Sequence, residues 1–159
     1  ENDIGDFKTF LKLSPPLRLE EDRIALVEGI KSGLIDVIVS DHTPEDEESK
    51  RLPFAQAAVG SIGIETLLPL ALELYHNESL TLNKIIETLT CNPAKILKIK
   101  KGTLKVGSDA DICVFDLNTP WVVKAENLKS KSKNTAIEDR KLQGKVMMTF
   151  LNGNLAYKI

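Results

Sequence analysis

The spacing of apolar residues predicts a helix near the start of the chain. Ile24, Val27 and Ile30 recur at helical spacing within residues 20–32, which begin with three acidic residues and are followed by a glycine. Acidic residues in the first turn and a glycine after the last turn are typical helix boundaries. The pattern therefore predicts a helix over residues 20–32.

A β-branched run follows this helix and ends in polar residues. Residues 34–40 read Leu-Ile-Asp-Val-Ile-Val-Ser, which predicts a short, buried parallel strand. A helix joined by a tight turn to a parallel strand is a unit of an α/β fold. Asp41 and His42 come directly after the predicted strand, and a polar, acidic loop is expected over residues 45–51.

Three further helices are predicted before residue 102. Residues 64–75 are apolar nearly all round, and Pro69 either kinks this helix or marks its start. A second helix is expected after Thr81, with one apolar face. A third, short helix is expected to begin with Asn92 as its cap and a proline at its first position.

Alternation replaces the helical period after residue 102. Residues 110–116 and 120–123 predict two short strands, and residues 124–140 predict a charged, loop-rich segment. Residues 146–157 predict a β-hairpin, because an Asn-Gly pair separates two apolar runs. The first hundred residues are thus α/β in pattern, and the remainder is mostly β.

Composition excludes several classes of partner. The 159 residues are 42% hydrophobic and 28% charged, with a formal net charge of -2 and an aromatic content of 5%. We therefore expect no nucleic-acid partner and no membrane partner. The first six residues lack the pattern of a leader, and a cytoplasmic location is predicted. Cys91 and Cys113 lie in apolar contexts, which predicts reduced, buried packing residues.

Asp41 is the leading candidate for chemistry. A carboxylate at the carboxyl end of a parallel strand is placed to bind a metal and to move protons, although a role in capping the turn is equally compatible with the spacing. His42 is expected to be structural, and His76 is expected to lie at the surface. A catalytic zinc commonly takes three protein ligands. With two histidines and no paired cysteines, the chain is either no metalloenzyme or depends on ligands that it lacks.

Five segments, in order, resemble the dihydroorotases and related cyclic amidohydrolases. Residues 13–18 (LSPPLR) resemble the family segment NPPLR, and residues 40–44 (SDHTP) resemble TDHAPH. Residues 63–66 (GIET) resemble GxET, and residues 92–111 resemble the stretch from NPA to the AD pair. Residues 130–135 (SKSKNT) resemble SKSKNTPF, which is typical of dihydroorotases.

The resemblance implies an α/β fold, namely the C-terminal part of a TIM-type (β/α)8 barrel together with part of a small β-domain. Residues 1–101 would form the last strands and helices of the barrel, and residues 102–159 would form a segment of the β-domain. It also implies zinc, one or two ions, with most ligands outside this chain. The chain is therefore expected to be a fragment, inactive alone, whose N-terminal half is missing.

The reaction implied is the interconversion of N-carbamoyl-aspartate and dihydroorotate in pyrimidine biosynthesis. Asp41 matches the residue that binds zinc and acts as general acid/base. Ser14, Glu45, Val59 and Gly60 match substrate-binding positions, but Ser14 replaces an Asn and Glu45 replaces a His. Because Glu45 would repel an anionic substrate, a compensating positive charge is hypothesised for two neighbours, Lys50 and Arg51.

Two alternatives remain beside this interpretation. One is another cyclic amidohydrolase of the allantoinase or hydantoinase type, against which residues 130–135 argue. The other is a non-catalytic dihydroorotase-like assembly partner, which the changes at Ser14 and Glu45 favour and the retained Asp41 disfavours. The expected partners of the enzyme are a small-molecule substrate and the missing N-terminal half, and a homo-oligomer is possible.

Overall fold

The computed structural model describes residue 5 and residues 7–159, so most of the predicted leader-free start lies outside the described residues. The chain forms two compact units, each built from separate segments. We call the first the loop unit; it comprises the residues up to Leu26, Ser40–Leu67 and Val122–Lys141. We call the second the helix–sheet unit; it comprises Val27–Val39, Leu68–Trp121 and Leu142–Ile159. The predicted boundary after residue 101 stays a prediction.

The first predicted helix is confirmed at both ends. Helix α1 spans Glu20–Ser32, with acidic residues in its first turn and Lys31 in its last. Arg23 pairs with Glu20 at 2.6 Å, three residues apart on the helix surface. The acidic start and basic end oppose the charges of the helix dipole, so local charges contribute to the stability of this element.

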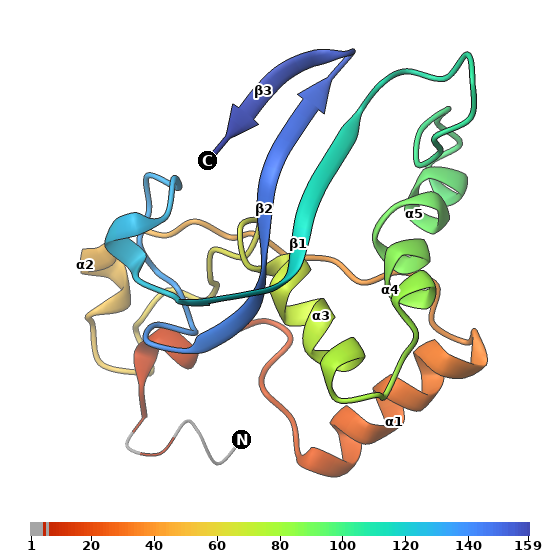
Figure 1. Ribbon diagram of the computed structural model, residues 1–159. Coiled ribbons are helices and arrows are strands. Elements are labelled where there is room, and N and C mark those ends of the chain that lie inside the picture. The colour runs from red at the N-terminus through yellow and green to blue at the C-terminus, as the bar shows by residue number, and fades with distance from the viewer. Residues whose placement is uncertain (1–4, 6) are drawn as a thin grey trace. The chain divides into compact units, whose positions relative to one another are not determined.

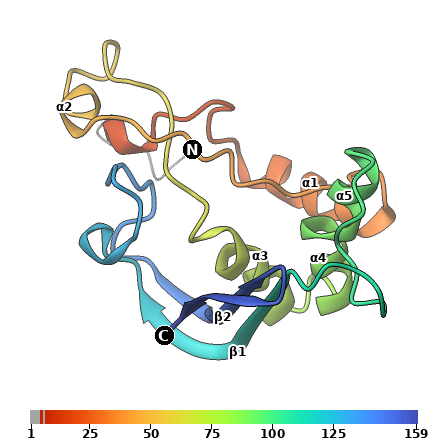
Figure 2. The ribbon, with the colours of Figure 1, turned by 90° about the horizontal axis from the view of Figure 1, so that it is seen from above.

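The later helices are confirmed with shifted ends. Helix α3 spans Leu67–His76, so Pro69 falls in its first turn, where its missing N–H costs nothing. Helix α4 spans Leu82–Leu89, and the Thr81 hydroxyl caps it by accepting a hydrogen bond from the N–H of Lys84 at 3.3 Å. Figures 1 and 2 show α3 and α4 as successive helices joined by a short turn.

Two short helices depart from the predictions. Helix α5 spans Cys91–Ile96, so Asn92 lies inside it rather than capping it. The Asn92 amide instead donates to the carbonyl of Asp36 at 3.0 Å. Helix α2 spans Glu47–Lys50 within the segment expected to be a loop, because the Asp46 side chain caps its first turn by accepting from the N–H of Glu48. A 3-10 helix, η2, spans Thr9–Leu11.

The predicted strand over residues 34–40 is not a strand in this structure. The segment is extended, but it forms no named strand, and Leu34 and Val39 are 84% and 71% exposed. Its backbone makes isolated hydrogen bonds instead of a ladder, such as the bond from the N–H of Ile38 to the carbonyl of Thr88 at 3.3 Å. A β-branched run favours extension, but a strand also needs a neighbour to pair with, and the described residues supply none.

One three-stranded sheet is present among the described residues, in the order β1-β2-β3. Strand β1 spans Ile112–Val122, so the two strands predicted there are one. Strands β2 (Lys141–Leu151) and β3 (Asn154–Lys158) form the predicted antiparallel hairpin. Asn152 and Gly153 both have positive φ, 49° and 78°, as the tightest hairpin turn requires. A second 3-10 helix, η3, spans Ala125–Asn127 in the predicted loop.

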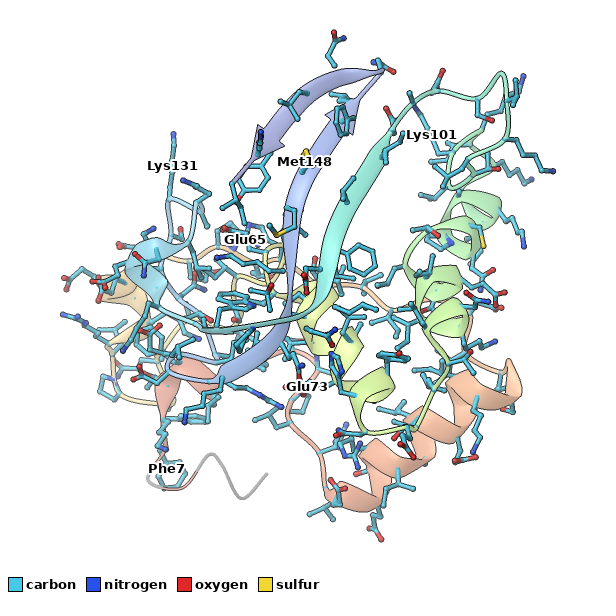
Figure 3. The ribbon with its side chains drawn as sticks, in the orientation of Figure 1. Phe7, Glu65, Glu73, Lys101, Lys131 and Met148 are labelled. Carbon is cyan, nitrogen blue, oxygen red and sulfur yellow. The ribbon has the colours of Figure 1, made fainter. Side chains whose placement is uncertain are left out.

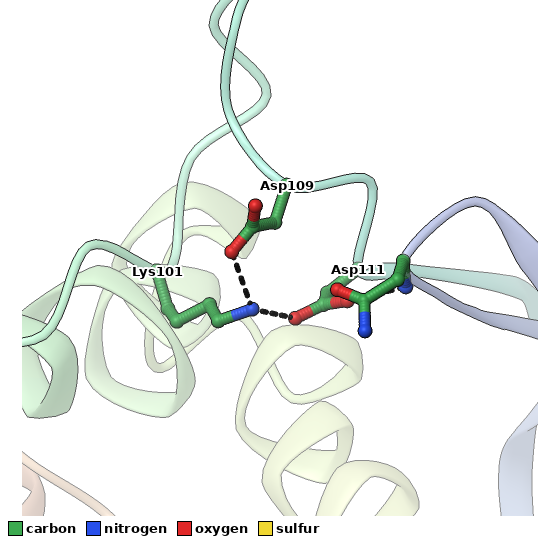
Figure 4. Close-up of polar contacts among 4 residues, drawn as sticks. Lys101, Asp109 and Asp111 are labelled. Carbon is green, nitrogen blue, oxygen red and sulfur yellow. Dashed lines mark hydrogen bonds and ion pairs between the residues drawn. The ribbon is translucent and has the colours of Figure 1, made fainter.

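A cluster of charges holds the start of β1 against the hairpin turn. The Lys101 ammonium pairs with Asp109 at 2.8 Å and with Asp111 at 2.5 Å (Figure 4). The other Asp111 oxygen accepts from the N–H of Asn152 at 2.8 Å. These bonds hold the pKa of Asp111 below its ordinary value, first through the Asn152 N–H and then through Lys101. The cluster therefore stabilises a turn.

The core of the helix–sheet unit is aliphatic. Its buried members come from the end of α1, from α3 and α4, and from the turn between these two, and they are Ile30, Ala71, Leu80 and Ile85. The side chains packed around them are Val27, Ile35, Ile38, Leu74 and Leu89. Gly144 of β2 lies so close to α3 that a Cβ there would meet the Leu72 side chain at 2.5 Å.

The cysteine prediction is partly wrong. Both residues are free thiols, but Cys91 is half-buried and Cys113 is exposed, so neither is a core residue. No helix within residue 5 and residues 7–159 combines the length and apolar character needed to cross a membrane.

Candidate functional site

Asp41 directly follows the extended segment 34–40 and belongs to the loop unit. Its backbone is left-handed, with φ of 43°, and its side chain is exposed. Short polar residues tolerate this conformation better than branched ones, which suits an Asp here. The hydroxyl of Thr43 donates to the Asp41 carbonyl at 3.0 Å and closes the turn.

His42 joins this turn to a segment about twenty residues further along. It forms an isolated parallel bridge with Ser61, and the N–H of Thr43 donates to the carbonyl of Ser61 at 2.9 Å. The Nδ1 atom of His42 accepts from the N–H of Gly63 at 3.1 Å. Because Nδ1 accepts a backbone N–H, the ring hydrogen lies on Nε2. The expected structural role of His42 thus agrees with its contacts.

Gly60 lies against the same turn. Its φ is 130°, and a Cβ at this position would meet the Thr43 side chain at 2.6 Å. Both features restrict the position to glycine. The residues that follow Asp41 and those around Gly60, distant in sequence, are therefore in direct contact.

Lys50 ties the loop together from inside. Its side chain is 0% exposed, and its ammonium donates to the carbonyls of Ala58 (3.0 Å), Gly60 (3.0 Å) and Lys12 (3.2 Å). Burial lowers the pKa of Lys50, whereas the nearby charge of Glu45 opposes that shift. An ammonium has three N–H groups, and all three are used here. The hypothesis that Lys50 supplies a compensating positive charge stays a prediction: its ammonium is fully buried, but it lies near the charge of Glu45.

Two other positive charges near the loop have local partners. Lys12 donates to the carbonyls of Ala55 at 3.1 Å and Ala57 at 2.8 Å, and so holds the far side of the loop. Arg51 pairs with Glu47 on the surface of α2. The charge that Arg51 was expected to supply is thus offset by a neighbour.

Asn134 approaches the same loop from the segment that resembles SKSKNTPF. Its side chain is 0% exposed. The amide nitrogen donates to the carbonyls of Thr43 at 3.0 Å and Gly60 at 3.4 Å, and the amide oxygen accepts from the N–H of Glu45 at 3.1 Å. Sequence reasoning used this residue only as a family signature and missed its contacts.

Glu65 supplies a second tie to that segment. Its carboxylate, labelled in Figure 3, accepts from the N–H groups of Lys129 at 2.9 Å and Ser130 at 3.0 Å. Glu65 belongs to the GIET segment, so two of the recognised motifs contact each other. The signal for both residues was present in the sequence as motifs without an assigned role.

The predicted substrate-binding residues fall within the loop unit. Ser14 is exposed two residues after Lys12, whose carbonyl accepts from the N–H of Gly60 at 3.0 Å. Gly60 thus has both backbone groups engaged within the chain, whereas the exposed Val59 makes no backbone hydrogen bond to any described residue. Glu45 is half-buried, and its charge lies near the Lys50 ammonium.

The environment of His76 differs from the prediction. His76 was expected at the surface, but it is half-buried, and its Nε2 is buried without a partner among the described residues.

Within residue 5 and residues 7–159, no three His, Cys, Asp or Glu side chains cluster in a way that would hold a metal ion. The exposed Asp41 fits the role of one zinc ligand, but the described residues do not form a complete zinc site.

Two curated relatives that the chain matches over nearly its whole length are both dihydroorotases. The chain is 45% identical over 158 residues to the dihydroorotase of Ehrlichia chaffeensis, covering 99% of this chain and 35% of that protein. It is 46% identical over 147 residues to the dihydroorotase of Aquifex aeolicus, covering 92% and 35%. The chain therefore spans about a third of the length of the curated relatives that it matches.

Solved structures give the fold. The L-hydantoinase (dihydropyrimidinase) of Arthrobacter aurescens matches with a TM-score of 0.88 and 33% identity, over 99% of this chain and 36% of that one. The dihydropyrimidinase of Brevibacillus agri matches with a TM-score of 0.89 and 26% identity, over 97% and 35%. The predicted fold class, part of a TIM-type amidohydrolase, is confirmed. The amidohydrolase family model matches residues 11–156, so the chain belongs to the amidohydrolase family.

Proposed function

We propose that the whole protein is a zinc-dependent dihydroorotase that interconverts N-carbamoyl-aspartate and dihydroorotate. The observation that carries the proposal is the contact of the turn after Asp41 with Gly60 and Ser61, because the predicted catalytic and substrate-binding residues all lie in this one unit. The dihydroorotases that cover nearly the whole chain at 45–46% identity support this substrate over other cyclic amides.

In this proposal Asp41 has two roles. Its carboxylate provides one ligand to the metal, and the remaining ligands lie in the part of the protein outside this chain. A bound zinc ion supplies Lewis acidity toward the ring amide carbonyl. In the hydrolytic direction, water adds to that carbonyl carbon and the C–N bond of the ring breaks. Asp41 accepts the proton that water loses and passes it to the leaving ring nitrogen.

The substrate-binding roles are proposals of different kinds. Ser14 would offer a hydroxyl, and Val59 would offer its backbone N–H or carbonyl to the substrate. Gly60 would act by shape, since its backbone polar groups are already used within the chain. An anionic substrate would be tolerated beside Glu45 because the nearby Lys50 ammonium offsets the negative charge of Glu45.

The rest of the protein is the partner that we propose for the exposed apolar side chains. In the helix–sheet unit these include Leu34, Val39, Leu97 and Leu104, all more than half exposed. A barrel strand is normally covered on both faces, so the segment 34–40 would gain its strand neighbours from the part of the protein outside this chain. Co-expression of this chain with the remainder of its protein tests this: a stable complex is expected, and a monomeric, cooperatively folded 159-residue chain would contradict it. Cytoplasmic location and homo-oligomerisation stay predictions.

The test of the proposed reaction uses the purified whole protein. Interconversion of carbamoyl-aspartate and dihydroorotate is expected, with zinc in the purified protein by elemental analysis. Asp41→Asn should lower kcat by about 100- to 10,000-fold, the usual contribution of a general acid/base. Glu87→Gln is the control, because it also neutralises a carboxylate, and Glu87 is exposed on helix α4 away from the proposed site residues.

Two outcomes would replace the proposal. Turnover of hydantoin or allantoin without turnover of dihydroorotate would assign another cyclic amide as substrate, an alternative that the similarity to the L-hydantoinase of Arthrobacter aurescens supports. A whole protein that holds no metal and turns over none of these compounds would leave the assembly partner as the remaining function.

A further inference from the structure

The buried side-chain amide of Asn134 contacts the backbone of two segments of the candidate site. Its two N–H groups donate to Thr43 and Gly60, and its oxygen accepts from Glu45. These partners lie two and four residues after Asp41 and one residue after Val59. The amide therefore bridges the two segments that carry the proposed chemistry.

The segment that carries Asn134 is itself fastened to the loop unit. The N–H of Ile62 donates to the backbone carbonyl of Asn134 at 3.3 Å, and the N–H of Ala136 donates to the Ser61 hydroxyl at 2.9 Å. Glu65 holds the same segment further upstream. Because its backbone is held on both sides, the Asn134 amide acts from a fixed point.

The chemistry of the bridge requires an amide. The side chain must donate to two carbonyls and accept from one N–H at the same time, while it is fully buried. A carboxylate of the same size would accept from the N–H but would face two carbonyl oxygens, and an alanine would leave all three backbone groups without this partner.

We propose that Asn134 is a positioning residue for the reaction: it holds the Thr43–Glu45 turn at a fixed distance from Val59 and Gly60, and so holds Asp41 and the substrate-binding backbone in one geometry. The kinetic consequence rests on the proposed dihydroorotase activity. Misplacement of a catalytic group by about 1 Å is sufficient to lower a rate by about 100-fold. The structural consequence is independent of activity, because the Glu45 N–H bonds directly to the Asn134 oxygen.

The experiment compares Asn134→Ala, Asn134→Asp and the control Asn127→Asp in the whole protein. Asn127 lies on the same connecting segment, but its side chain is exposed. Asn134→Ala should lower kcat/KM for dihydroorotate by about 10- to 100-fold per folded molecule and should speed hydrogen exchange at the Glu45 amide. Asn134→Asp should lower kcat/KM while the Glu45 amide stays protected, because the acceptor oxygen remains. Asn127→Asp should change neither.

The outcomes separate positioning from simple stabilisation. If kcat/KM per folded molecule stays within about twofold of the unsubstituted protein in both Asn134 variants, the proposal is overturned, whatever their thermal stability. If Asn134→Ala does not fold, Asn134→Asp, which keeps the volume, decides the matter by the same measurement. If the unsubstituted protein has no dihydroorotase activity, the proposed function fails and the exchange rates alone decide: unchanged protection of Glu45 in Asn134→Ala overturns the positioning role.

Discussion

Both units bury apolar side chains, but the longest buried polar side chains, Lys50 and Asn134, lie in the loop unit. In the loop unit, Lys50 and Asn134 are both 0% exposed, and each donates to carbonyls of irregular backbone. In the helix–sheet unit, Leu72 and Ile85 are equally buried, within helices whose backbone groups bond to one another. Buried backbone groups require partners. Where regular structure does not supply them, side chains must, which is why the loop unit buries an ammonium and an amide beside its apolar residues.

This difference has a consequence for function. The candidate site lies on the irregular backbone of the loop unit, where Asp41 adopts a left-handed conformation. A buried hydrogen-bonded network fixes such a backbone in one arrangement, whereas aliphatic packing tolerates small rearrangements more readily. The comparison predicts that changes in the loop unit affect geometry most, and that changes in the helix–sheet unit affect stability most.

The largest effect on stability is expected for Ile85→Ala. The change removes a fully buried side chain from the core of the helix–sheet unit and should cost about 3–4 kcal/mol. Hydrogen exchange of the α4 amides in the whole protein measures this local free energy. Glu87→Ala, at an exposed polar position on the same helix, is the matched control. An equal loss in both variants would contradict the assigned core.

A somewhat smaller loss is expected for Lys50→Met. Methionine keeps the length of the side chain but leaves three carbonyls without the ammonium, at a cost of about 2–3 kcal/mol after the relief of charge burial. The measurement is the exchange rate of the Gly60 amide together with the thermal midpoint. The exposed Lys131, labelled in Figure 3, provides the control Lys131→Met. If Lys50→Met stabilises the protein, the polar interior of the loop unit is not needed for its fold.

A cap in the helix–sheet unit should give an intermediate effect. Thr81→Ala removes the acceptor for the N–H of Lys84 and should cost about 1 kcal/mol. Thr81→Asn keeps an acceptor and should restore most of the loss. Faster exchange at the first turn of α4 in the alanine variant alone is the expected result, and equal exchange in the two variants would argue against the cap.

The smallest effect concerns pH and the partly exposed Asp111. Its pKa is held below the ordinary value, first by the N–H of Asn152 and then by Lys101. A lowered pKa in the folded state means stabilisation that is present above the unfolded-state pKa and lost as pH falls through the folded-state value. NMR titration should show the low pKa in the whole protein, and Asp111→Asn should remove the acid-dependent loosening of the hairpin turn. Asp109→Asn, which leaves the Asn152 contact intact, should retain it.

The regular elements were predictable from local signals. The acidic first turn and the glycine after the last turn placed α1, and the Asn-Gly pair placed the β2–β3 turn, because caps and tight turns depend on neighbours in sequence. The segment 34–40 was predicted as a buried strand from the same kind of evidence, and that prediction is wrong here. Its β-branched residues favour extension, but pairing depends on other segments.

The contacts of Lys50 and Asn134 could not be predicted from their residue types. A lysine in an acidic loop suggested an exposed charge for the substrate, whereas the fold buries it among carbonyls. Asn134 was visible only as part of a motif, because its partners lie about 74 to 91 positions away in the chain. No local pattern identifies which carbonyls remain unpaired after folding, so neither role was accessible before the structure.

The sequence by itself determined the helices, the hairpin, the family and the candidate Asp41, since these depend on short-range patterns and ordered motifs. Only the tertiary structure decided that residues 12, 41–45, 58–63 and 134 meet in one unit, and that an ammonium and an amide hold them together. The physical reason is that irregular backbone leaves its hydrogen bonds to be completed by whatever the fold brings near. The partners of these backbone groups are therefore residues far away in the sequence, which no local pattern identifies.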